Sequence, residues 1–393
     1  MQNEVTINGR LSRQRAAKGG LLVNIGVPRE AGPGEKRVGL VADAVKRLVG
    51  AGHSVLVEVG AGQAAGVSDQ DYTQAGAKVV PGEEVWKADL IVKVERPTDE
   101  EIGRMRAGQV LIALLQHLAY PETAEKLAAQ GVTAFAMDWM PRITRAQDMD
   151  ARSSMSTVQG YKAALAAAEL LPRFMPMLMT AAGTIAPAHV LIIGAGVAGL
   201  QAIATAKRLG AVVEAFDVRP ATKEQVESLG ARFVPMDLQL EKAQDEQGYA
   251  VAVGDEVLEL ERQTLAKKLP QTDAVISTAL VPGQKPPVLL TKEMVATMRP
   301  GSVIVDLAAA FGGNCELTQP GEITEYNGVQ VVGYTDWESR LAVHASQMYS
   351  RNVLAYLNFL LKDGALNLNT EDELVSFPLI THGGEFRGRK GGQ

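Results

Sequence analysis

The feature that most constrains this chain is a glycine-rich loop placed between an apolar run and a helical pattern. Residues Gly194–Gly199 read G-A-G-V-A-G, with the apolar run His189–Ile193 before them and a helical pattern over Leu200–Leu209 after them. Such a strand–turn–helix unit is typical of parallel α/β sheets, in which each strand is followed by a helix that covers one face of the sheet. The sequence therefore predicts a Rossmann-like domain around this loop.

The glycines of this loop fit the steric needs of a dinucleotide. Gly194 permits the tight turn, Gly196 lets the backbone approach a pyrophosphate, and Gly199 lets the helix pack closely on the strand. The helix begins near Val197, where free N–H groups and the positive end of the helix dipole can bind phosphates. We therefore predict that Gly194, Gly196, Val197 and Gly199 contribute to a dinucleotide site.

An acidic residue at the end of the next predicted strand indicates which dinucleotide is bound. Asp217 ends the run Val212–Asp217, 23 residues after Gly194. A carboxylate there can accept a hydrogen bond from the ribose 2′-OH and repels the 2′-phosphate of NADP(H), so we expect a preference for NAD(H). Arg219 weakens this argument, because a nearby guanidinium could bind a phosphate.

The remaining apolar runs alternate with helical patterns, as expected for parallel sheets with crossover helices. A length of 393 residues suits two such domains rather than one. In the first half, helices are expected at Gly39–Ala51 and Ser156–Leu171, and strands at Leu22–Val27, Ser54–Val59, Leu90–Val94, Val110–Leu114 and Thr133–Met137. In the second half, a long helix is expected at Ser339–Leu361, and strands at His189–Ile193, Val212–Asp217, Arg232–Val234, Ala274–Ser277, Val303–Asp306 and Val329–Val332.

We therefore expect an α/β chain of two Rossmann-like, doubly wound parallel-sheet domains. Residues 1–21 are predicted to be a flexible extension, 22–152 plus 342–393 a first α/β domain, and 153–341 the NAD(H)-binding Rossmann domain. The last long helix is expected to pack back on the first domain. A short polar tail with β character follows it.

Composition excludes several other classes of protein. The net charge of −6 argues against nucleic acid as a partner, because a phosphate backbone requires a basic surface. Cys315 is the single cysteine, so no internal disulfide is possible, and we expect a reducing, cytoplasmic compartment. No apolar run approaches the length of a membrane span, no secretory signal is recognisable, and no metal site is expected.

A second glycine pattern resembles the first loop but lacks its context. Gly60–Ala65 fits a loose G-x-G-x-x-[G/A] pattern after a strand. The following Gly66–Asp69 is typical of a new helix cap, and the next strand, near Lys78–Val80, has no terminal acid. We predict that this pattern is a structural turn.

One segment resembles a specific family. Met140–Asp150, continuing to Ser153 and Ser154, resembles the Arg–Gln–Asp loop of proton-translocating nicotinamide nucleotide transhydrogenases. Collinear matches extend along nearly the whole chain from residue 22: Gly26–Glu30, Leu200–Lys207, Ala221–Val226, Thr278–Gly283, Gly312–Cys315 and Gly333–Asp336. The chain is most similar to the NAD(H)-binding alpha subunit of this family.

The resemblance implies that Arg142, Gln147, Asp150 and Ser153 surround the nicotinamide end of the bound nucleotide. A charge-assisted pair between the Arg and Asp side chains would fix the loop, and Gln147 offers both donors and an acceptor. The alternative is a surface turn in which Asp150 and Ser153 only cap a helix.

The long polar stretch Met236–Arg262 is expected to be a loop, because a short connection is usual at this point of the fold. In the transhydrogenase family a mobile loop closes over the nucleotide, and the resemblance assigns its Tyr to Tyr249. Gly248 and Leu280 would be backbone neighbours of the nucleotide. Where the family pattern has Met, this chain has Val253.

The activity implied by the resemblance is direct hydride transfer from NADH on this chain to NADP⁺ on a partner, coupled to proton translocation. The implied partners are a second copy in a homodimer, an NADP(H)-binding subunit and a membrane-spanning proton-channel subunit. The chain would then be cytoplasmic and peripheral to the inner membrane through those subunits.

Two other functions compete with this one. The architecture also resembles alanine dehydrogenase, with Arg37, Lys93 and His117 as counterparts of its substrate site. The position four residues after Asp306, where that enzyme carries Asp, is Ala310. Reductive amination needs a positioned acid or base, whereas hydride transfer between two nicotinamides needs only alignment and a dry site, so alanine dehydrogenase is less favoured. A non-catalytic NADH-sensing module would keep Asp217 but has no use for the Arg142–Asp150 loop.

Overall fold

The computed structural model describes residues 23–236, 254–281, 283–361 and 366–388. The chain divides into two compact units, one formed by residues 1–155 and 341–393 and the other by residues 156–340. Helix α6 (Ala151–Leu170) contains the first boundary between them. The predicted N-terminal extension, 1–21, and the residues Gly248, Tyr249 and Val253 lie outside the described residues.

The first unit contains an eight-stranded sheet in the order β17-β16-β6-β5-β4-β1-β2-β3. The strands from β6 to β3 run parallel and follow the doubly wound order 3-2-1-4-5-6, and β16 and β17 add antiparallel neighbours at the β6 edge. The strands are β1 (Asn24–Val27), β2 (Ser54–Glu58), β3 (Lys78–Val80), β4 (Leu90–Glu95), β5 (Val110–Leu114), β6 (Thr133–Ala136), β16 (Leu379–His382) and β17 (Glu385–Phe386).

Short helices connect these strands. They are α1 (Ala42–Gly50), η1 (Gln63–Ala65), α2 (Asp69–Gln74), α3 (Gly82–Val85), α4 (Asp99–Arg104), α5 (Pro121–Ala129), η2 (Met137–Trp139), η3 (Thr144–Met149) and α12 (Glu373–Ser376). The long α11 (Ala342–Leu360) contacts α1, η1 and η3 within the same unit. Its buried face includes Ser346 and Ser350, whose hydroxyls accept hydrogen bonds from the N–H groups of Val38 and Val41.

The second unit contains a seven-stranded sheet in the order β11-β10-β9-β12-β13-β15-β14. All neighbours are parallel except β14, an antiparallel edge strand that the sequence pattern did not predict. The strands are β9 (His189–Ile193), β10 (Val212–Phe216), β11 (Arg232–Phe233), β12 (Ala274–Ser277), β13 (Val303–Asp306), β14 (Ile323–Tyr326) and β15 (Val329–Val332). The prediction of two Rossmann-like doubly wound folds is confirmed.

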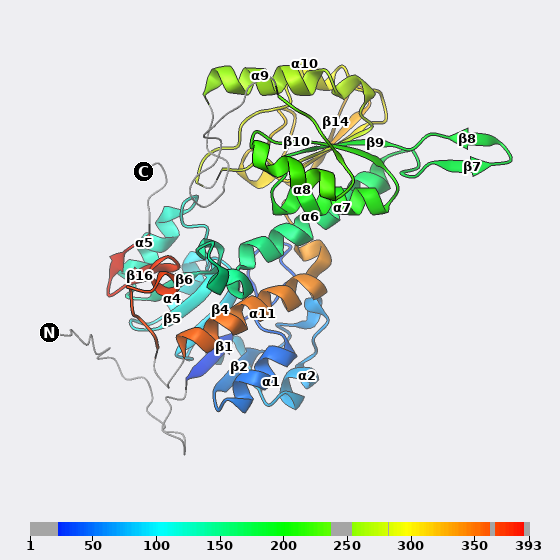
Figure 1. Cartoon of the computed structure of the whole chain (residues 1–393). Helices are drawn as coiled ribbons and strands as arrows, with labels where there is room; N and C mark the ends of the chain where they lie inside the picture. The colour runs from blue at the N-terminus through cyan, green and yellow to red at the C-terminus, as the bar shows by residue number, and fades with distance from the viewer. Residues whose placement is uncertain (1–22, 237–253, 282, 362–365, 389–393) are drawn as a thin grey trace. The chain divides into compact units, whose positions relative to one another are not determined.

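The core of the second unit follows from the alternation of side chains along each strand. Val190 and Ile192 belong to the apolar cluster that includes residues of α6 and α7 (Val197–Arg208), whereas Leu191 and Ile193 belong to the cluster on the opposite face. Helices α9 (Asp255–Ala266) and α10 (Lys292–Val295) contribute to that second cluster, and Figure 1 shows them on the opposite side of the sheet from α7 and α8 (Lys223–Ser228). Because both faces are covered, the strands are apolar at almost every position.

Two segments of the second unit differ from the prediction. The stretch expected to be a loop up to Arg262 is helical from Asp255 onward, because Leu258 and Leu265 lie at helical spacing and are part of the core. The Pro- and Met-rich connection contains a hairpin, β7 (Leu178–Thr180) and β8 (Gly183–Ile185), which projects from the sheet of its unit (Figure 1).

The structural turn predicted at Gly60–Ala65 is confirmed. Ser68 caps α2 with a reciprocal capping box to Asp71, so no helix continues from the glycine pattern. A Cβ on Gly62 would lie 2.7 Å from the Tyr72 hydroxyl, so a side chain already fills the space beside this glycine.

Candidate functional site

The glycine-rich loop lies at the carboxyl end of β9, beside the point where the strand order of the second unit reverses between β9 and β12. In doubly wound sheets this switch point is where ligands bind. Gly194 has φ +92°, and a Cβ there would lie 2.5 Å from Oγ1 of Thr278, so only glycine fits. Thr278 follows β12 and closes the turn, because its Oγ1 donates to the carbonyls of Ile193 and Gly194 at 3.2 and 3.1 Å.

The other two glycines of the loop have opposite surroundings. A Cβ on Gly199 would lie 1.8 Å from the Gly194 carbonyl oxygen, so this glycine is required for the helix to pack against the turn. A Cβ on Gly196 would meet no atom within 4 Å. Gly196 precedes α7 and no side chain caps that helix, so the N–H groups of its first turn face a position at which a phosphate fits.

Asp217 follows β10 and is fully engaged by the chain. Its Oδ1 accepts from the N–H and Nε of Arg219 at 2.8 and 2.9 Å, and its Oδ2 accepts from Ala195 N–H at 2.6 Å and Arg219 Nη2 at 2.8 Å. These four bonds use the acceptor capacity of a carboxylate. A ribose hydroxyl can therefore reach Asp217 only by sharing or displacing one of these donors, which the sequence did not indicate.

The segment after β12 is held by a buried polar network. The side chain of Asn314 accepts from Ser277 Oγ and from Ala279 N–H and donates to the carbonyls of Ala279 and Pro287. Asp306 in turn accepts from the N–H groups of Asn314 and Cys315 and from Thr318 Oγ1. The network fixes the backbone that leads to Leu280, and no motif in the sequence assigned this role to Asp306 or Asn314.

The Arg142–Asp150 segment belongs to the first unit and forms η3 with its flanks. Ala146 and Met149 are buried, Asn352 Nδ2 donates to the Asp148 carbonyl at 2.8 Å, and Arg145 pairs with Asp372. These contacts hold the segment in place while Arg142 and Gln147 stay exposed.

Asp150 and Ser153 have the capping role that we considered as an alternative. Asp150 Oδ1 accepts from Ser153 N–H at 2.9 Å and Oδ2 accepts from Ser153 Oγ, which satisfies the first turn of α6. Among the described residues Asp150 does not pair with Arg142, so the charge-assisted pair that we expected is wrong. The carboxylate is instead used at the helix terminus.

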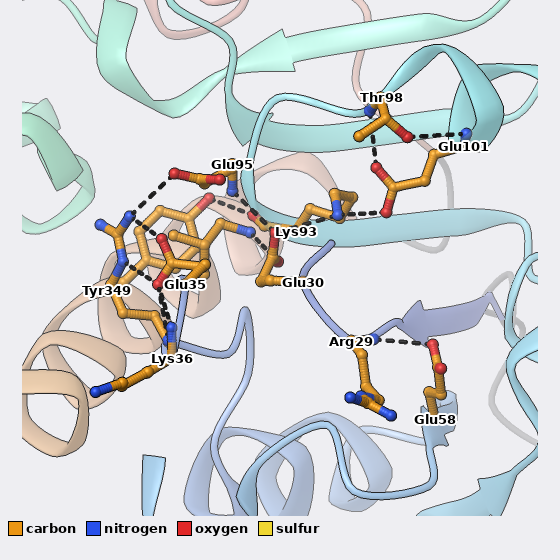
Figure 2. A network of polar contacts seen from close by, with 12 residues as sticks. Arg29, Glu30, Glu35, Lys36, Glu58, Lys93, Glu95, Thr98, Glu101 and Tyr349 are labelled. Atoms are coloured by element: carbon orange, nitrogen blue, oxygen red, sulfur yellow. Dashed lines mark hydrogen bonds and ion pairs between the residues drawn. The ribbon is translucent and has the colours of Figure 1, made fainter. Parts of the chain in front are cut away.

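Arg37 and Lys93 lie in a buried ionic network after β1 and β4 of the first unit (Figure 2). Lys93 Nζ contacts Glu101 Oε1 at 2.7 Å and Glu30 Oε2 at 3.1 Å, and the Lys93 side chain is 1% exposed. Burial alone would lower the pKa of Lys93, but the charges of Glu30 and Glu101 outweigh burial and raise it. Arg37 pairs with Glu35, so carboxylates of the chain itself bind both cations.

His117 is buried and lies edge-on to Trp139, with 5.2 Å between ring centroids. Neither ring nitrogen has a hydrogen-bond partner among the described residues, and burial lowers the pKa of His117 to about 4. Ala310 is exposed in the short helix η6 (Ala309–Phe311), so no carboxylate is present at that position. The described residues thus hold the three counterparts of an amino-acid site but not its acid.

Neither a membrane-spanning element nor a metal cluster is found in the portion of the chain that the structure describes. None of its helices combines the length and the apolar character needed to cross a bilayer. No group of three or more His, Cys, Asp and Glu side chains among those residues could hold a metal ion.

Two doubly wound units, one with a strand–G-x-G-x-x-G–helix turn and an acid after its second strand, define a two-domain protein of the Rossmann type. The family model described as alanine dehydrogenase/PNT, N-terminal domain, matches residues 26–159, and the corresponding C-terminal domain model matches residues 163–388. The chain belongs to the alanine dehydrogenase/PNT family.

Individual relatives agree with this assignment. The chain is 46% identical over 372 residues to an NAD(P) transhydrogenase alpha subunit of Rhodospirillum rubrum, covering 92% of this chain and 97% of that protein. A crystal structure of transhydrogenase from Sinorhizobium meliloti matches with a TM-score of 0.83 and 44% identity, over 92% of this chain and 99% of that one. Alanine dehydrogenase of Bacillus subtilis is 34% identical over 296 residues, covering 74% of this chain and 72% of that protein. The resemblance to transhydrogenases is confirmed.

Proposed function

We propose that this chain is the NAD(H)-binding subunit of a proton-translocating transhydrogenase, and that it supports direct hydride transfer from NADH to NADP⁺ held by a partner subunit. The observation that carries this proposal is the match to a transhydrogenase alpha subunit over nearly the full length of both chains. The open position beside Gly196 and the acid at Asp217 support nucleotide binding in the second unit.

In this proposal the backbone of the glycine loop binds the pyrophosphate. The N–H groups at the start of α7, from Val197 onward, donate to phosphate oxygens, and Gly196 leaves the room that they need. Asp217 accepts from the adenosine ribose once Arg219 yields one of its bonds. Leu280 offers backbone groups on the segment fixed by Asn314, and the resemblance adds Gly248 and Tyr249.

The nicotinamide ring supplies the hydride when the nucleotides are bound. The chain then has no proton to move at the reacting carbon, so its contribution is alignment and exclusion of water. We assign alignment to the segment with Arg142 and Gln147, which the chain anchors through Ala146, Met149 and Asn352 while these two side chains stay exposed. Asp150 and Ser153 support that segment by capping α6.

The proposal includes a homodimer, an NADP(H)-binding subunit and a membrane-spanning subunit that carries the protons, with this chain cytoplasmic and peripheral to the inner membrane. The hairpin β7–β8 supports the homodimer. Met179 and Ile185 are 80% and 41% exposed, and the two strands pair only with each other. An isolated apolar hairpin is marginally stable in water, so a second copy that covers it would stabilise it.

Reconstitution with a partner tests the proposal. The purified chain is mixed with an NADP(H)-binding transhydrogenase subunit, and reduction of an NADP⁺ analogue with a shifted absorbance is followed after addition of NADH. We expect transfer only when both proteins are present. Absence of transfer in the complete mixture, with both proteins shown to bind their nucleotides, would contradict the proposal.

The buried Arg37, Lys93 and His117 favour alanine dehydrogenase as a second candidate. The chemistry of that enzyme needs a positioned acid or base, and the exposed Ala310 cannot supply one. We expect no reduction of pyruvate with ammonium and NADH across the neutral and mildly alkaline pH range. A turnover of about 1 s⁻¹, at the low end of ordinary enzymes, would favour this candidate instead.

A non-catalytic NADH-sensing module is a third candidate. It would bind NADH at the same loop but gain nothing from the Arg142–Asp150 segment. If NADH binds and the reconstituted mixture transfers no hydride, this candidate replaces the proposed one.

A further inference from the structure

Glu261 is a buried carboxylate on α9, and it belongs to none of the motifs described above. It is 4% exposed. Leu258 and Leu265 lie three residues before it and four residues after it, so the three side chains share one face of the helix. That face packs into the apolar cluster of the unit, which includes both leucines.

The same cluster contains the residues on either side of Asp217. Phe216 is part of it and Val218 packs against it, so the buried face of α9 and the segment carrying Asp217 lie against one core. The negative charge of Asp217 acts on Glu261: burial first, and then this charge, raise the pKa of Glu261 to about 7. Two carboxyl groups therefore adjoin the place where the ribose acid is expected.

Cations near the two carboxyl groups are unequally distributed. Arg219 binds both oxygens of Asp217, so these two charges compensate each other. Among the described residues, no side chain or backbone group donates a hydrogen bond to Glu261 or forms an ion pair with it. Its neighbour Arg262 lowers the pKa of Glu261 only as the third influence, because its guanidinium donates to the Val288 carbonyl from Nε and Nη2 at 2.9 and 2.7 Å.

This charge distribution changes the argument for nucleotide preference. An Asp217 that is neutralised by Arg219 repels a phosphate weakly, and Arg219 by itself would attract one. We propose that Glu261 is a specificity-determining residue whose carboxylate supplies the surplus negative charge that disfavours the 2′-phosphate of NADP(H) beside Asp217. This inference rests on the proposed NAD(H) site.

The charge is costly to the fold, which gives an independent readout. A buried carboxylate without a cationic partner destabilises a protein, and a residue retained at such a cost is expected where function needs it. Glu261→Gln keeps the shape of the side chain and removes the charge. We expect this variant to unfold at a higher temperature than the wild type at pH 8.5, where the carboxylate is ionised.

Nucleotide titrations of the full chain at pH 8.5 test the inference directly. Dissociation constants for NADH and NADPH are measured by quenching of intrinsic fluorescence in the wild type, Glu261→Gln and Glu261→Met. We expect both variants to bind NADPH about tenfold more tightly, as removal of one nearby like charge predicts, and NADH within about twofold of the wild type. The control Glu259→Gln removes the same charge from an exposed position of α9 and should change neither constant by more than about twofold.

Unchanged NADPH binding in both Glu261 variants overturns the inference, as does an equal gain in Glu259→Gln. The outcome for the wild type is separate. A wild type that binds NADH no better than NADPH contradicts the proposed NAD(H) site, whereas a wild type that prefers NADH, with variants that keep the full preference, contradicts only the role of Glu261.

Discussion

Arg219 covers both carboxylate oxygens of Asp217, with Nε 2.9 Å from Oδ1 and Nη2 2.8 Å from Oδ2. The carboxylate also accepts from Ala195 N–H, which ties it to the glycine loop. The acid that should select the nucleotide is thus built into the loop architecture before it meets a ligand. Its two functions can be separated by substitution.

Asp217→Asn should weaken NADH binding about tenfold, because a neutral amide accepts a weaker hydrogen bond from the ribose than a carboxylate does. It should also narrow the ratio between the NADPH and NADH dissociation constants, because Arg219 loses its counter-charge. Fluorescence titration of both nucleotides checks this. The control Asp336→Asn removes an acid that pairs with Arg340 near the surface and should leave both constants unchanged. Equal loss for both nucleotides would mean that Asp217 only supports the loop.

Gln147→Ala should lower reconstituted hydride transfer about a hundredfold while NADH affinity stays within a few-fold. The side chain is exposed and the segment is anchored by its neighbours, so the substitution removes an aligning group without unfolding η3. Stopped-flow transfer and NADH titration of the same variant separate the two effects. Asp148→Ala, one residue away and also exposed, serves as the control. Loss of rate and affinity in equal measure would make Gln147 an ordinary binding residue.

His117→Phe should remove a pH dependence of stability. Burial lowers the pKa of His117 in the folded protein from 6.5 to about 4. The folded-state pKa is below the unfolded one, so the neutral ring contributes stability that is present above pH 6.5 and is lost as the pH falls toward 4. A shift of this size corresponds to a loss on the order of 3 kcal/mol.

Urea unfolding of wild type and variant at pH 7.5 and 4.5 measures that loss. Phe keeps an aromatic ring against Trp139 but cannot be protonated, so the variant should lose about 3 kcal/mol less than the wild type between these pH values. Replacement of the exposed His344 by Phe is the control. The same loss in His117→Phe and the wild type would show that this ring does not titrate as described.

Met179→Asp combined with Ile185→Asp should weaken the homodimer about a hundredfold, as expected for loss of two buried apolar side chains at about 1.5 kcal/mol each. Sedimentation velocity over a range of concentrations measures the dissociation constant. Val343→Asp introduces the same charge at an exposed apolar position of α11 and should have no effect. A double variant that remains as dimeric as the wild type would exclude the hairpin from the interface.

Most strands could be predicted because each is a short apolar run bounded by turn residues. The runs Val110–Leu114 and His189–Ile193 coincide with β5 and β9. The hairpin β7–β8 and the edge strand β14 were missed because their exposed residues carry no alternation that a core would impose. Helix α9 was missed because its charged residues concealed the spacing of Leu258 and Leu265.

The candidate site divides in the same way. The glycine loop is local in sequence, so its turn and the helix after it could be predicted from residues 189–209 alone. The saturation of Asp217 by Arg219, the Asn314 network and the burial of Glu261 all depend on how strands and helices pack in three dimensions. Asp150 was assigned the wrong partner because charge complementarity suggested Arg142, whereas the start of α6 needs an acceptor for Ser153 N–H.

The most direct test of the proposed function follows one hydrogen atom. The chain is combined with an NADP(H)-binding transhydrogenase subunit, NADH deuterated at the transferred position of C4 is added with NADP⁺, and the NADPH formed is analysed by mass spectrometry. Direct transfer predicts one deuterium in each NADPH, no loss of label to water, and no product when either protein is omitted. NADPH that lacks the label, or that forms at the same rate without this chain, would contradict the central claim.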